Sequence, residues 1–309
     1  MIQVKNLTKR YAEHIAVQDL SFSIEKGQVY GFLGPNGAGK STTMNIITGC
    51  LAPSQGQVQI GGFDIFTQPG KAKALIGYLP EQPPVYPDRT PREYLVFVAR
   101  AKGIGKKQLG KEIARVMKLT GITHVADRLI GHLSKGYRQR VGIAQALLGD
   151  PEIIILDEPT VGLDPLQIVE IRELIRLLGK DHTVILSSHI LSEIQAVCDT
   201  VMIISQGKLL ACDTPENLEA QYAKTATLTL TVEASIAQAE QLLAGTDACI
   251  VTSENRCTAQ IQVPNGQEDD LCRRLFHACA QAGTPILSMN VQKLTLEDIF
   301  LKLTRKEEL

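Results

Sequence analysis

The sequence of 309 residues lacks an apolar run long enough to cross a membrane. Its apolar runs, such as Val201–Ile204, have the length of a strand, whereas a spanning helix needs about 20 apolar residues. The N-terminal residues 1–6 also lack the apolar core of a signal peptide. We therefore expect a soluble chain, in which any membrane role depends on a partner.

The chain also lacks a net charge that would favour nucleic acid. It has 32 Lys and Arg against 33 Asp and Glu, and a nucleic-acid-binding domain usually carries a basic excess. The cysteines show no pairing pattern either: there are seven, an odd number, and none belongs to a Cys-x-x-Cys motif. We expect reduced cytosolic thiols rather than disulfides or a metal site. From the balanced charge we expect no nucleic-acid partner.

The hydrophobic residues, 44% of the chain, are enough for a large core, and their spacing predicts two domains. In the first, over residues 1–216, short strands occupy parts of 2–60 and a helical subdomain follows at about 84–150. The apolar runs 153–156 and 183–187 do not alternate, which is typical of strands buried on both faces of a parallel sheet. We expect an α/β domain in which helices cover a mixed sheet.

Residues 217–309 change pattern and predict a second, smaller α+β domain. Strand and helix patterns alternate in the order β-α-β-β-α-β, at 227–232, 236–243, 248–252, 257–263, 268–282 and 286–290. This order matches the ferredoxin-like pattern. A last helix is expected after Thr295, which can form a capping box with Asp298.

A glycine-rich segment between an expected strand and an expected helix fits the phosphate-loop pattern G-x-x-x-x-G-K-[ST]. It reads Gly34-Pro35-Asn36-Gly37-Ala38-Gly39-Lys40-Ser41 and is followed by Thr42. The glycines let successive N–H groups point at phosphate oxygens, and the helix N-terminus adds partial positive charge. Lys40 can then reach the β- and γ-phosphates, and Ser41 can bind Mg²⁺. The alternative is a glycine-rich turn with an incidental lysine.

Two carboxylates follow the apolar run Ile153–Leu156. Asp157 would lie at the carboxyl end of a central strand, beside the phosphate loop, where it can hold Mg²⁺ directly or through water. Glu158 can orient and polarise the water that attacks the γ-phosphate. Two surface carboxylates in a Glu158-Pro159 turn are the alternative, and the preceding apolar run argues against it.

Ser134-Lys135-Gly136 precedes an expected helix over 137–148 and admits two interpretations. Ser134 is typical of a helix N-cap. Alongside a phosphate loop and the Asp157-Glu158 pair, Ser134 and the backbone near Gly136 can instead contact a γ-phosphate. We favour the second interpretation, which gives the domain more phosphate-binding parts than one phosphate needs.

In this order the motifs resemble those of the nucleotide-binding subunits of ABC transporters, over roughly residues 1–215. The resemblance matches Gly34–Ser41 to Walker A, Leu133–Tyr137 to the signature, Ile153–Glu158 to Walker B, Gly162–Asp164 to the D-loop and Ser187–His189 to the switch region. It implies that His189 senses the γ-phosphate and that Tyr11 stacks on adenine.

Two departures from the family pattern concern the signature and the Q-loop. Lys135 and Tyr137 stand where Gly and Gln are usual, although Ser134 and Gly136 would keep the phosphate contacts. In the Q-loop, Glu81 stands where the family's Gln usually lies, and Gln82 follows it. Either side chain could face Mg²⁺, and a carboxylate is a suitable ligand.

The resemblance implies an ATPase subunit that binds Mg-ATP and drives a separate transmembrane permease from the inner face of the cell membrane. Two such subunits pair head to tail in the family, so Ser134 and Gly136 would act on the ATP of the partner. The helical subdomain, with the stiff segment 83–87, would receive the permease, and a rigid connector is the alternative for that segment. The segment Leu296–Thr304 resembles the tail of exporter-type subunits, so we expect export and leave the cargo open.

Two other functions compete with this one. An ABC ATPase that acts on the ribosome or DNA usually carries two ATPase cores or a long coiled coil, and this sequence has one core and no sustained heptads. Another P-loop enzyme, such as a small kinase, has no need for Ser134–Gly136.

Overall fold

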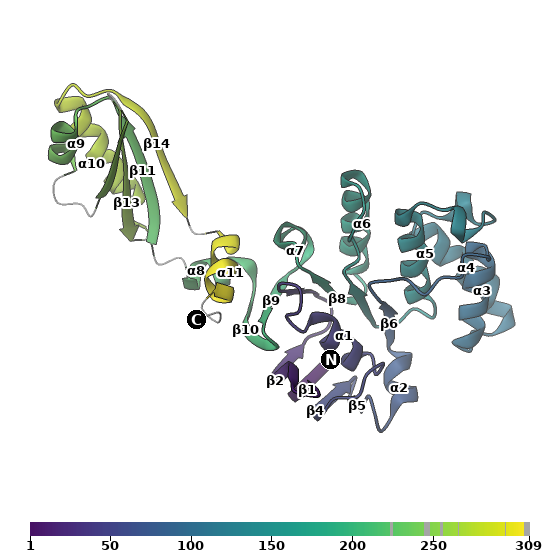
Figure 1. Ribbon diagram of the computed structural model, residues 1–309. Helices are drawn as coiled ribbons and strands as arrows, with labels where there is room; N and C mark the ends of the chain where they lie inside the picture. Colours follow the sequence, from purple (N-terminus) through teal and green to yellow (C-terminus); the bar gives the residue numbers. More distant parts are fainter. Residues whose placement is uncertain (223–224, 244–247, 254–255, 265, 294, 306–309) are drawn as a thin grey trace. The chain divides into compact units, whose positions relative to one another are not determined.

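The computed structural model describes residues 1–222, 225–243, 248–253, 256–264, 266–293 and 295–305. The chain folds as two compact units, Met1–Thr214 and Pro215–Leu309 (Figure 1). No helix within the described ranges is both long enough and apolar enough to cross a bilayer.

A mixed six-stranded sheet forms the centre of the first unit. In spatial order its strands are β10 (Lys208–Asp213), β9 (Thr200–Ser205), β3 (Val29–Leu33), β8 (Thr183–Ser188), β7 (Ile153–Asp157) and β6 (Ile76–Leu79). β10 pairs antiparallel with β9, and the other neighbours are parallel. Every residue of β3, β7 and β8 is buried, which confirms the two predicted parallel strands. Their carboxyl ends meet at one edge of the sheet.

A second, antiparallel sheet has the order β2 (His14–Ile24), β1 (Ile2–Tyr11), β4 (Gln55–Ile60) and β5 (Phe63–Asp64). β1, of 10 residues, and β2, of 11 residues, are longer than the short strands that were expected within 2–60. The register of this pair shifts between Val4 and Leu7, and Asn6 and Asp19 have φ angles of 48° and 50°. Such bulges break the period-two alternation on which strand prediction depends.

Seven α-helices belong to the described part of the first unit: α1 (Lys40–Ile47), α2 (Pro69–Ala74), α3 (Pro91–Ala101), α4 (Lys106–Leu119), α5 (Lys135–Leu147), α6 (Pro165–Leu178) and α7 (Leu191–Val197). α3, α4 and α5 pack together, and α5 also contacts β6 (Figure 1). Between α4 and α5 only short 3₁₀ turns form, at Thr123–Val125 and Ile130–His132. This stretch is too short for the helical hydrogen-bond ladder to propagate.

The start of α3 has a clear local cause. The Thr90 hydroxyl accepts a hydrogen bond from the Glu93 N–H at 3.2 Å, and the Glu93 carboxylate accepts one from the Thr90 N–H at 3.0 Å. This capping box satisfies two N–H groups that the first turn would leave unpaired, and Pro91 at the first helical position needs no partner.

The core of the first unit joins both sheets and α1. Phe32 of β3 and Met44 of α1 are fully buried, together with residues of β1, β2 and β4. Replacing a side chain such as Phe32 with Ala would cost about 3–5 kcal/mol. β3 and α1 therefore hold the loop between them in a fixed place.

The second unit is α+β. Its elements are α8 (Pro215–Tyr222), β11 (Thr225–Val232), α9 (Ile236–Leu242), β12 (Ala248–Ser253), β13 (Arg256–Pro264), α10 (Glu268–Gln281), β14 (Ile286–Lys293) and α11 (Leu296–Arg305). The antiparallel sheet has the order β12-β13-β11-β14, and the predicted sequence of elements is confirmed. The capping box before α11 is also confirmed. The Thr295 N–H donates to the Asp298 carboxylate at 3.0 Å, and the Asp298 N–H donates to the Thr295 hydroxyl at 3.3 Å.

Candidate functional site

The site begins at the loop between β3 and α1, where backbone geometry requires glycine at specific positions. A Cβ atom on Gly34 would lie 2.3 Å from the carbonyl oxygen of Ile204. Gly39 has a φ of 99°, and a Cβ atom there would lie 2.5 Å from the carbonyl oxygen of Ala16. No other residue could take these conformations without moving the neighbouring strands. The loop curls tightly, with the Ala38 N–H donating to Pro35 at 3.2 Å.

Lys40 is the first residue of α1 and only 6% of it is exposed. Its ammonium donates to the carbonyl oxygens of Gly34 at 2.8 Å and Pro35 at 3.2 Å. It also lies 3.5 Å from Glu158 Oε1. The loop is therefore folded around a buried cation.

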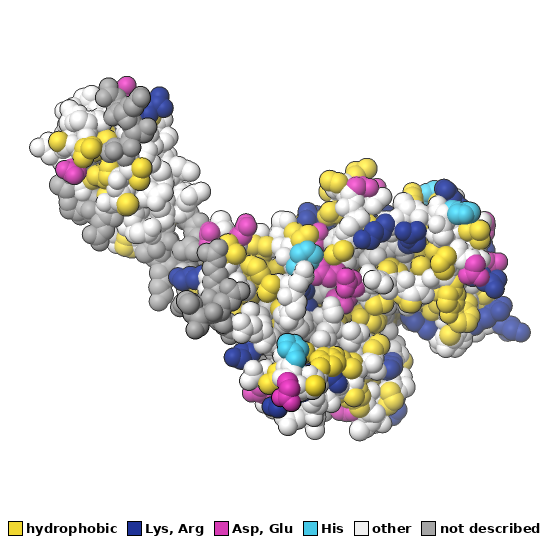
Figure 2. Space-filling model, viewed as in Figure 1, with side chains coloured by type: hydrophobic (Ala, Val, Ile, Leu, Met, Phe, Trp, Pro, Cys, Tyr) yellow, Lys and Arg dark blue, Asp and Glu magenta, His cyan; other side chains and the backbone are white. Residues whose placement is uncertain are grey.

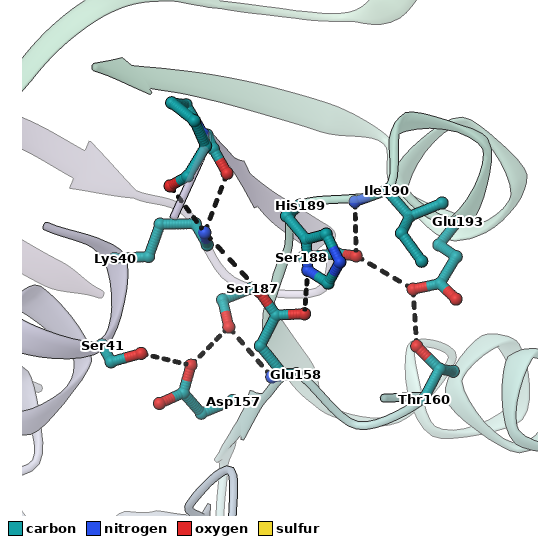
Figure 3. A network of polar contacts seen from close by, with 12 residues as sticks. Lys40, Ser41, Asp157, Glu158, Thr160, Ser187, Ser188, His189, Ile190 and Glu193 are labelled. Atoms are coloured by element: carbon teal, nitrogen blue, oxygen red, sulfur yellow. Dashed lines mark hydrogen bonds and ion pairs between the residues drawn. The ribbon is translucent and has the colours of Figure 1, made fainter. Parts of the chain in front are cut away.

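Asp157, the last residue of β7, is 2% exposed and carries two hydroxyl contacts. Ser41 donates to its Oδ1 at 3.2 Å and Ser187 donates to the same oxygen at 2.5 Å. Ser41 comes from α1 and Ser187 from β8, so the strand order brings these three oxygen groups together (Figure 3). Oxygen ligands of this kind suit Mg²⁺.

Glu158 follows β7 in a strained backbone conformation, with a φ of 47°, and is 7% exposed. Its N–H donates to Ser187 Oγ at 3.0 Å. Its Oε2 lies 3.0 Å from Nδ1 of His189, which follows β8 (Figure 3). A left-handed φ in a residue other than glycine often occurs at functional sites.

These residues surround a pocket of about 570 Å³. Its walls include ten predicted site residues: Tyr11, Asn36, Gly37, Gly39, Lys40, Ser41, Thr42, Glu81, Glu158 and His189. Gly34, Pro35, Ala38 and Asp157 are not among its lining residues, although Lys40 and Ser41 bond three of them directly.

Three lining residues were missed by sequence reasoning: His14, Ala16 and Val161. His14 pairs with Tyr11 across the β1–β2 hairpin, and this pairing places both side chains at the pocket. The two-residue turn between an extended β1 and β2 was the available signal, but bulges concealed these strands.

Tyr11 presents an aromatic face at the pocket and is 46% exposed. The Lys9 ammonium lies 5.2 Å from the centre of its ring, within range of a cation–π contact. An exposed ring at the mouth of a polar pocket can stack on a flat heterocycle.

Glu81 lines the pocket, whereas Gln82 is not among the lining residues. Nearby, burial raises the pKa of Tyr78, and the charges of Asp157 and Glu81 add to this effect. The protonated Tyr78 hydroxyl donates to Asn45 at 3.2 Å. Within the described ranges, no group of three or more His, Cys, Asp and Glu could hold a metal alone. A cation here would need further oxygens, such as those of a nucleotide.

Ser134 and Gly136 are not among the residues that line this pocket. Ser134 caps α5, its hydroxyl accepting from the Tyr137 N–H at 3.4 Å. Gly136 packs so closely on α6 that a Cβ atom there would lie 2.4 Å from Gln167 Oε1. The side chain of Lys135 lies against Gly162, whose added Cβ atom would fall 2.2 Å from its Nζ. The two predicted phosphate-binding elements thus do not form one pocket in one chain.

Sequence comparison matches residues 17–161 to the ABC transporter family model, a range that contains the loop 34–41 and Asp157. The chain is 34% identical to the linearmycin resistance ATP-binding protein LnrL of Bacillus subtilis (strain 168), over 98% of each chain. It is 44% identical to the bacitracin transport ATP-binding protein BcrA of Bacillus licheniformis, over 68% of each chain.

Solved structures give the same relationship. The structure of cbiO1 from Clostridium perfringens, part of the ABC transporter complex cbiONQ, has a TM-score of 0.65 and 29% identity, covering 71% of this chain and 90% of that one. The dimeric structure of MJ0796, a bacterial ABC transporter cassette, has a TM-score of 0.64 and 26% identity, covering 69% of this chain and 98% of that one.

Proposed function

The chain belongs to the ABC transporter ATP-binding proteins, and we propose that the pocket beside Lys40 is where it hydrolyses ATP. Membership makes the protein an ATPase whose hydrolysis of ATP serves transport. The observation that carries the assignment of the pocket is the contact of Lys40 with both the phosphate loop and Glu158.

The loop Gly34–Ser41 and Thr42 bind the phosphates of ATP in this proposal. The backbone N–H groups of the loop and the N-terminus of α1 supply fixed positive potential for the β- and γ-phosphates. The Lys40 ammonium then exchanges its contact with Glu158 for phosphate oxygens. The carbonyl oxygens of Gly34 and Pro35 hold the end of the lysine at the loop that would bind these phosphates.

Mg²⁺ would be held by Ser41 and Asp157, with Glu81, which lines the same pocket as Ser41, as a further ligand. The support is chemical: these are oxygen donors, and Ser41 and Asp157 already lie 3.2 Å apart. Mg²⁺ usually takes one or two carboxylates together with substrate phosphates, so this small protein set is sufficient. The bound cation supplies charge neutralisation for the transferring phosphoryl group.

Glu158 orients the attacking water and accepts its proton. Its backbone is fixed by Ser187, and His189 contacts its Oε2 at 3.0 Å. His189 also lines the pocket, which supports a contact with the γ-phosphate. Positioning of the water and neutralisation of charge supply most of the rate in such in-line displacements. Tyr11 stacks on the adenine, as its exposed ring allows.

Ser134 and Gly136 act on the ATP bound by a second subunit, in a head-to-tail dimer. Their absence from the pocket wall of their own chain supports this arrangement. The dimeric MJ0796 cassette is a structural relative that assembles in pairs. ATP would then stabilise the closed dimer, and hydrolysis would release it.

A transmembrane permease is the second partner, and the complex would hold this protein at the inner face of the membrane. Figure 2 shows hydrophobic side chains gathered over the layer of α3 to α5, flanked by charged ones. Tyr86 and Phe97 are 48% and 55% exposed, and the centres of their rings lie 5.8 Å apart in a tilted arrangement. They line a groove of about 510 Å³ that could receive an amphipathic helix of the permease.

The direction of transport that we propose is export, because relatives are named for linearmycin resistance and bacitracin transport. We also propose that the C-terminal unit is ferredoxin-like. Its β-α-β-β-α-β sequence and its strand order β12-β13-β11-β14 support that assignment.

Glu158→Gln tests the proposed site. The variant should still bind Mg-ATP and form an ATP-dependent dimer on size-exclusion chromatography, while kcat falls about 100-fold or more. Glu152→Gln is the matched control, since Glu152 precedes the same strand and is exposed. Hydrolysis close to that of the control, or no dimer with ATP, would overturn the proposal.

A further inference from the structure

Glu193 is a buried carboxylate that the proposed mechanism does not use. It lies in the first turn of α7 and is 3% exposed. None of the ion pairs found within the described residues includes it. Burial of an unpaired carboxylate is unfavourable unless hydrogen bonds compensate for lost water.

Two hydroxyl groups provide that compensation, and both donate to the same oxygen. Thr160 Oγ1 lies 2.5 Å from Glu193 Oε2, and Ser188 Oγ lies 2.9 Å from it (Figure 3). Thr160 is 4% exposed and Ser188 is fully buried, so water does not compete for these bonds. Ser188 Oγ also accepts from the Ile190 N–H at 3.0 Å.

The two hydroxyls come from the segments that carry Glu158 and His189. Thr160 lies two residues after Glu158, and the turn between them is closed by the Val161 N–H donating to Glu158 at 3.3 Å. Ser188 directly precedes His189, which contacts Glu158. Glu193 thus closes a ring that runs through Thr160, Glu158, His189 and Ser188 (Figure 3).

We propose that Glu193 is a positioning residue that holds His189 in register with Glu158 during hydrolysis. Ser187 already fixes the two segments on the side of Asp157, and Glu193 fixes them on the opposite side. Without the second connection, the segment 188–190 can shift relative to Glu158. A misplacement of about 1 Å at a reacting group can lower a rate about 100-fold. The inference rests on the proposed roles of Glu158 and His189.

A purely structural role is the competing account, because an acidic residue in the first turn stabilises a helix N-terminus. The two accounts differ in the parameter that they affect. Loss of helix stabilisation lowers the melting temperature but leaves kcat per folded chain unchanged. Loss of positioning lowers kcat, while KM for ATP stays near its original value because the phosphate loop is untouched.

The test measures kcat, KM and melting temperature of the full-length chain with Glu193→Ala and Glu193→Gln. We expect Glu193→Ala to lower kcat about tenfold or more with KM changed less than about twofold. Glu193→Gln should restore most of kcat, because one amide oxygen can accept both hydroxyl bonds. Equal loss in the two variants, or unchanged kcat in Glu193→Ala, would overturn the proposal.

Smaller changes keep the test decisive if Glu193→Ala does not fold. Thr160→Val removes one bond to Glu193, and Ser188→Ala removes the other together with the bond from the Ile190 N–H, so each should lower kcat. Thr120→Val is the matched control, because Thr120 is fully buried and its hydroxyl donates to Val116 at the end of α4. It should lower the melting temperature comparably and leave kcat unchanged. Lowered kcat in the control, or unchanged kcat in both other variants, would overturn the proposal.

A double variant identifies the residue through which Glu193 acts. In a His189→Ala background, Glu193→Ala should cause no further loss of kcat, since its effect passes through His189. If the loss of kcat in the double variant equals the product of the losses in the two single variants, the proposal is overturned. A failure of the proposed site is distinguishable, because the Glu158→Gln variant would then hydrolyse ATP normally whatever the Glu193 variants do.

Discussion

Lys40 Nζ lies 3.5 Å from Glu158 Oε1, and the two side chains are only 6% and 8% exposed. The contact joins the first residue of α1 to the residue that follows β7. Because a buried charge without its partner is strongly unfavourable, each residue stabilises the burial of the other. The two groups with the most direct proposed roles in ATP hydrolysis are thus also coupled in folding.

Lys40→Met should lower the free energy of unfolding of the nucleotide-free protein by about 3 kcal/mol, since it leaves Glu158 buried without a cation. The double variant Lys40→Met/Glu158→Gln should recover at least about 1 kcal/mol of the summed single losses. Urea unfolding followed by circular dichroism measures both. Lys26→Met is the control, because the Lys26–Glu152 pair is exposed and should contribute little. Strictly additive losses would contradict the coupling.

Mixing two inactive variants tests the head-to-tail arrangement. Ser134→Arg disrupts the signature, and Lys40→Arg disrupts the phosphate loop while keeping the cation beside Glu158. Each alone should be nearly inactive. An equal mixture should regain about a quarter of wild-type ATPase activity, if pairing is random and the two sites of a dimer act independently. No recovery, under conditions in which mixed dimers are detected by differently tagged chains, would exclude action in trans.

Glu81 gives a prediction about Mg²⁺. Glu81→Ala should raise the Mg²⁺ concentration needed for half-maximal ATPase activity about tenfold, since one oxygen ligand is lost. Glu81→Gln should have a smaller effect because its amide retains an oxygen. Gln82→Ala is the control and should behave as wild type, since Gln82 is not among the residues that line the pocket. A larger effect at Gln82 than at Glu81 would reverse this assignment.

Sequence patterns predicted the strands in which every residue has the same buried environment. The runs Ile153–Leu156 and Thr183–Ser187 are buried on both faces, so their uniform apolar character identified β7 and β8. Most of β1 and β2 was not predicted over residues 6–19, because bulges interrupt the alternation of these strands. The short strand β6 carried too few residues for any period to appear.

The site shows a similar division. The spacing in Gly34–Ser41 and the Asp157-Glu158 pair predicted residues that line one pocket or bond to its lining residues, because each motif places its binding groups within a few positions of each other. His14 and Glu193 were not predicted, since their positions depend on the pairing of β1 with β2 and on the burial of α7. The turn between β1 and β2 was the one sequence signal for His14, whereas the contacts of Glu193 arise from tertiary structure.

Glu112 gives a prediction about pH. Its two oxygens accept from Arg115 at 2.9 and 2.8 Å, and one also accepts from the Gly149 N–H at 2.9 Å. These bonds, that of Arg115 above all, lower the pKa of Glu112. The folded protein therefore releases this proton more readily than the unfolded chain, so the stabilisation is present above the ordinary carboxyl pKa and is lost as pH falls.

Glu112→Gln should lower the free energy of unfolding by about 1–2 kcal/mol at pH 7, and the difference from wild type should shrink below about pH 4. Urea unfolding at several pH values measures this. Asp127→Asn is the control, because the Arg92–Asp127 pair is exposed and screened by solvent. A difference for Glu112→Gln that persists unchanged at pH 3 would show that packing, not charge, connects α4 to the end of α5.

Phe97 tests the permease surface. Phe97→Ala should weaken binding of the detergent-purified permease about tenfold or more, because an exposed aromatic ring that lines a groove can serve as an anchor for a partner. The ATPase activity of the isolated chain should not change, since Phe97 does not line the nucleotide pocket. Phe276→Ala is the matched control: Phe276 is 57% exposed and belongs to the second unit. Equal weakening in both variants would mean that the groove beside α3 is not the docking site.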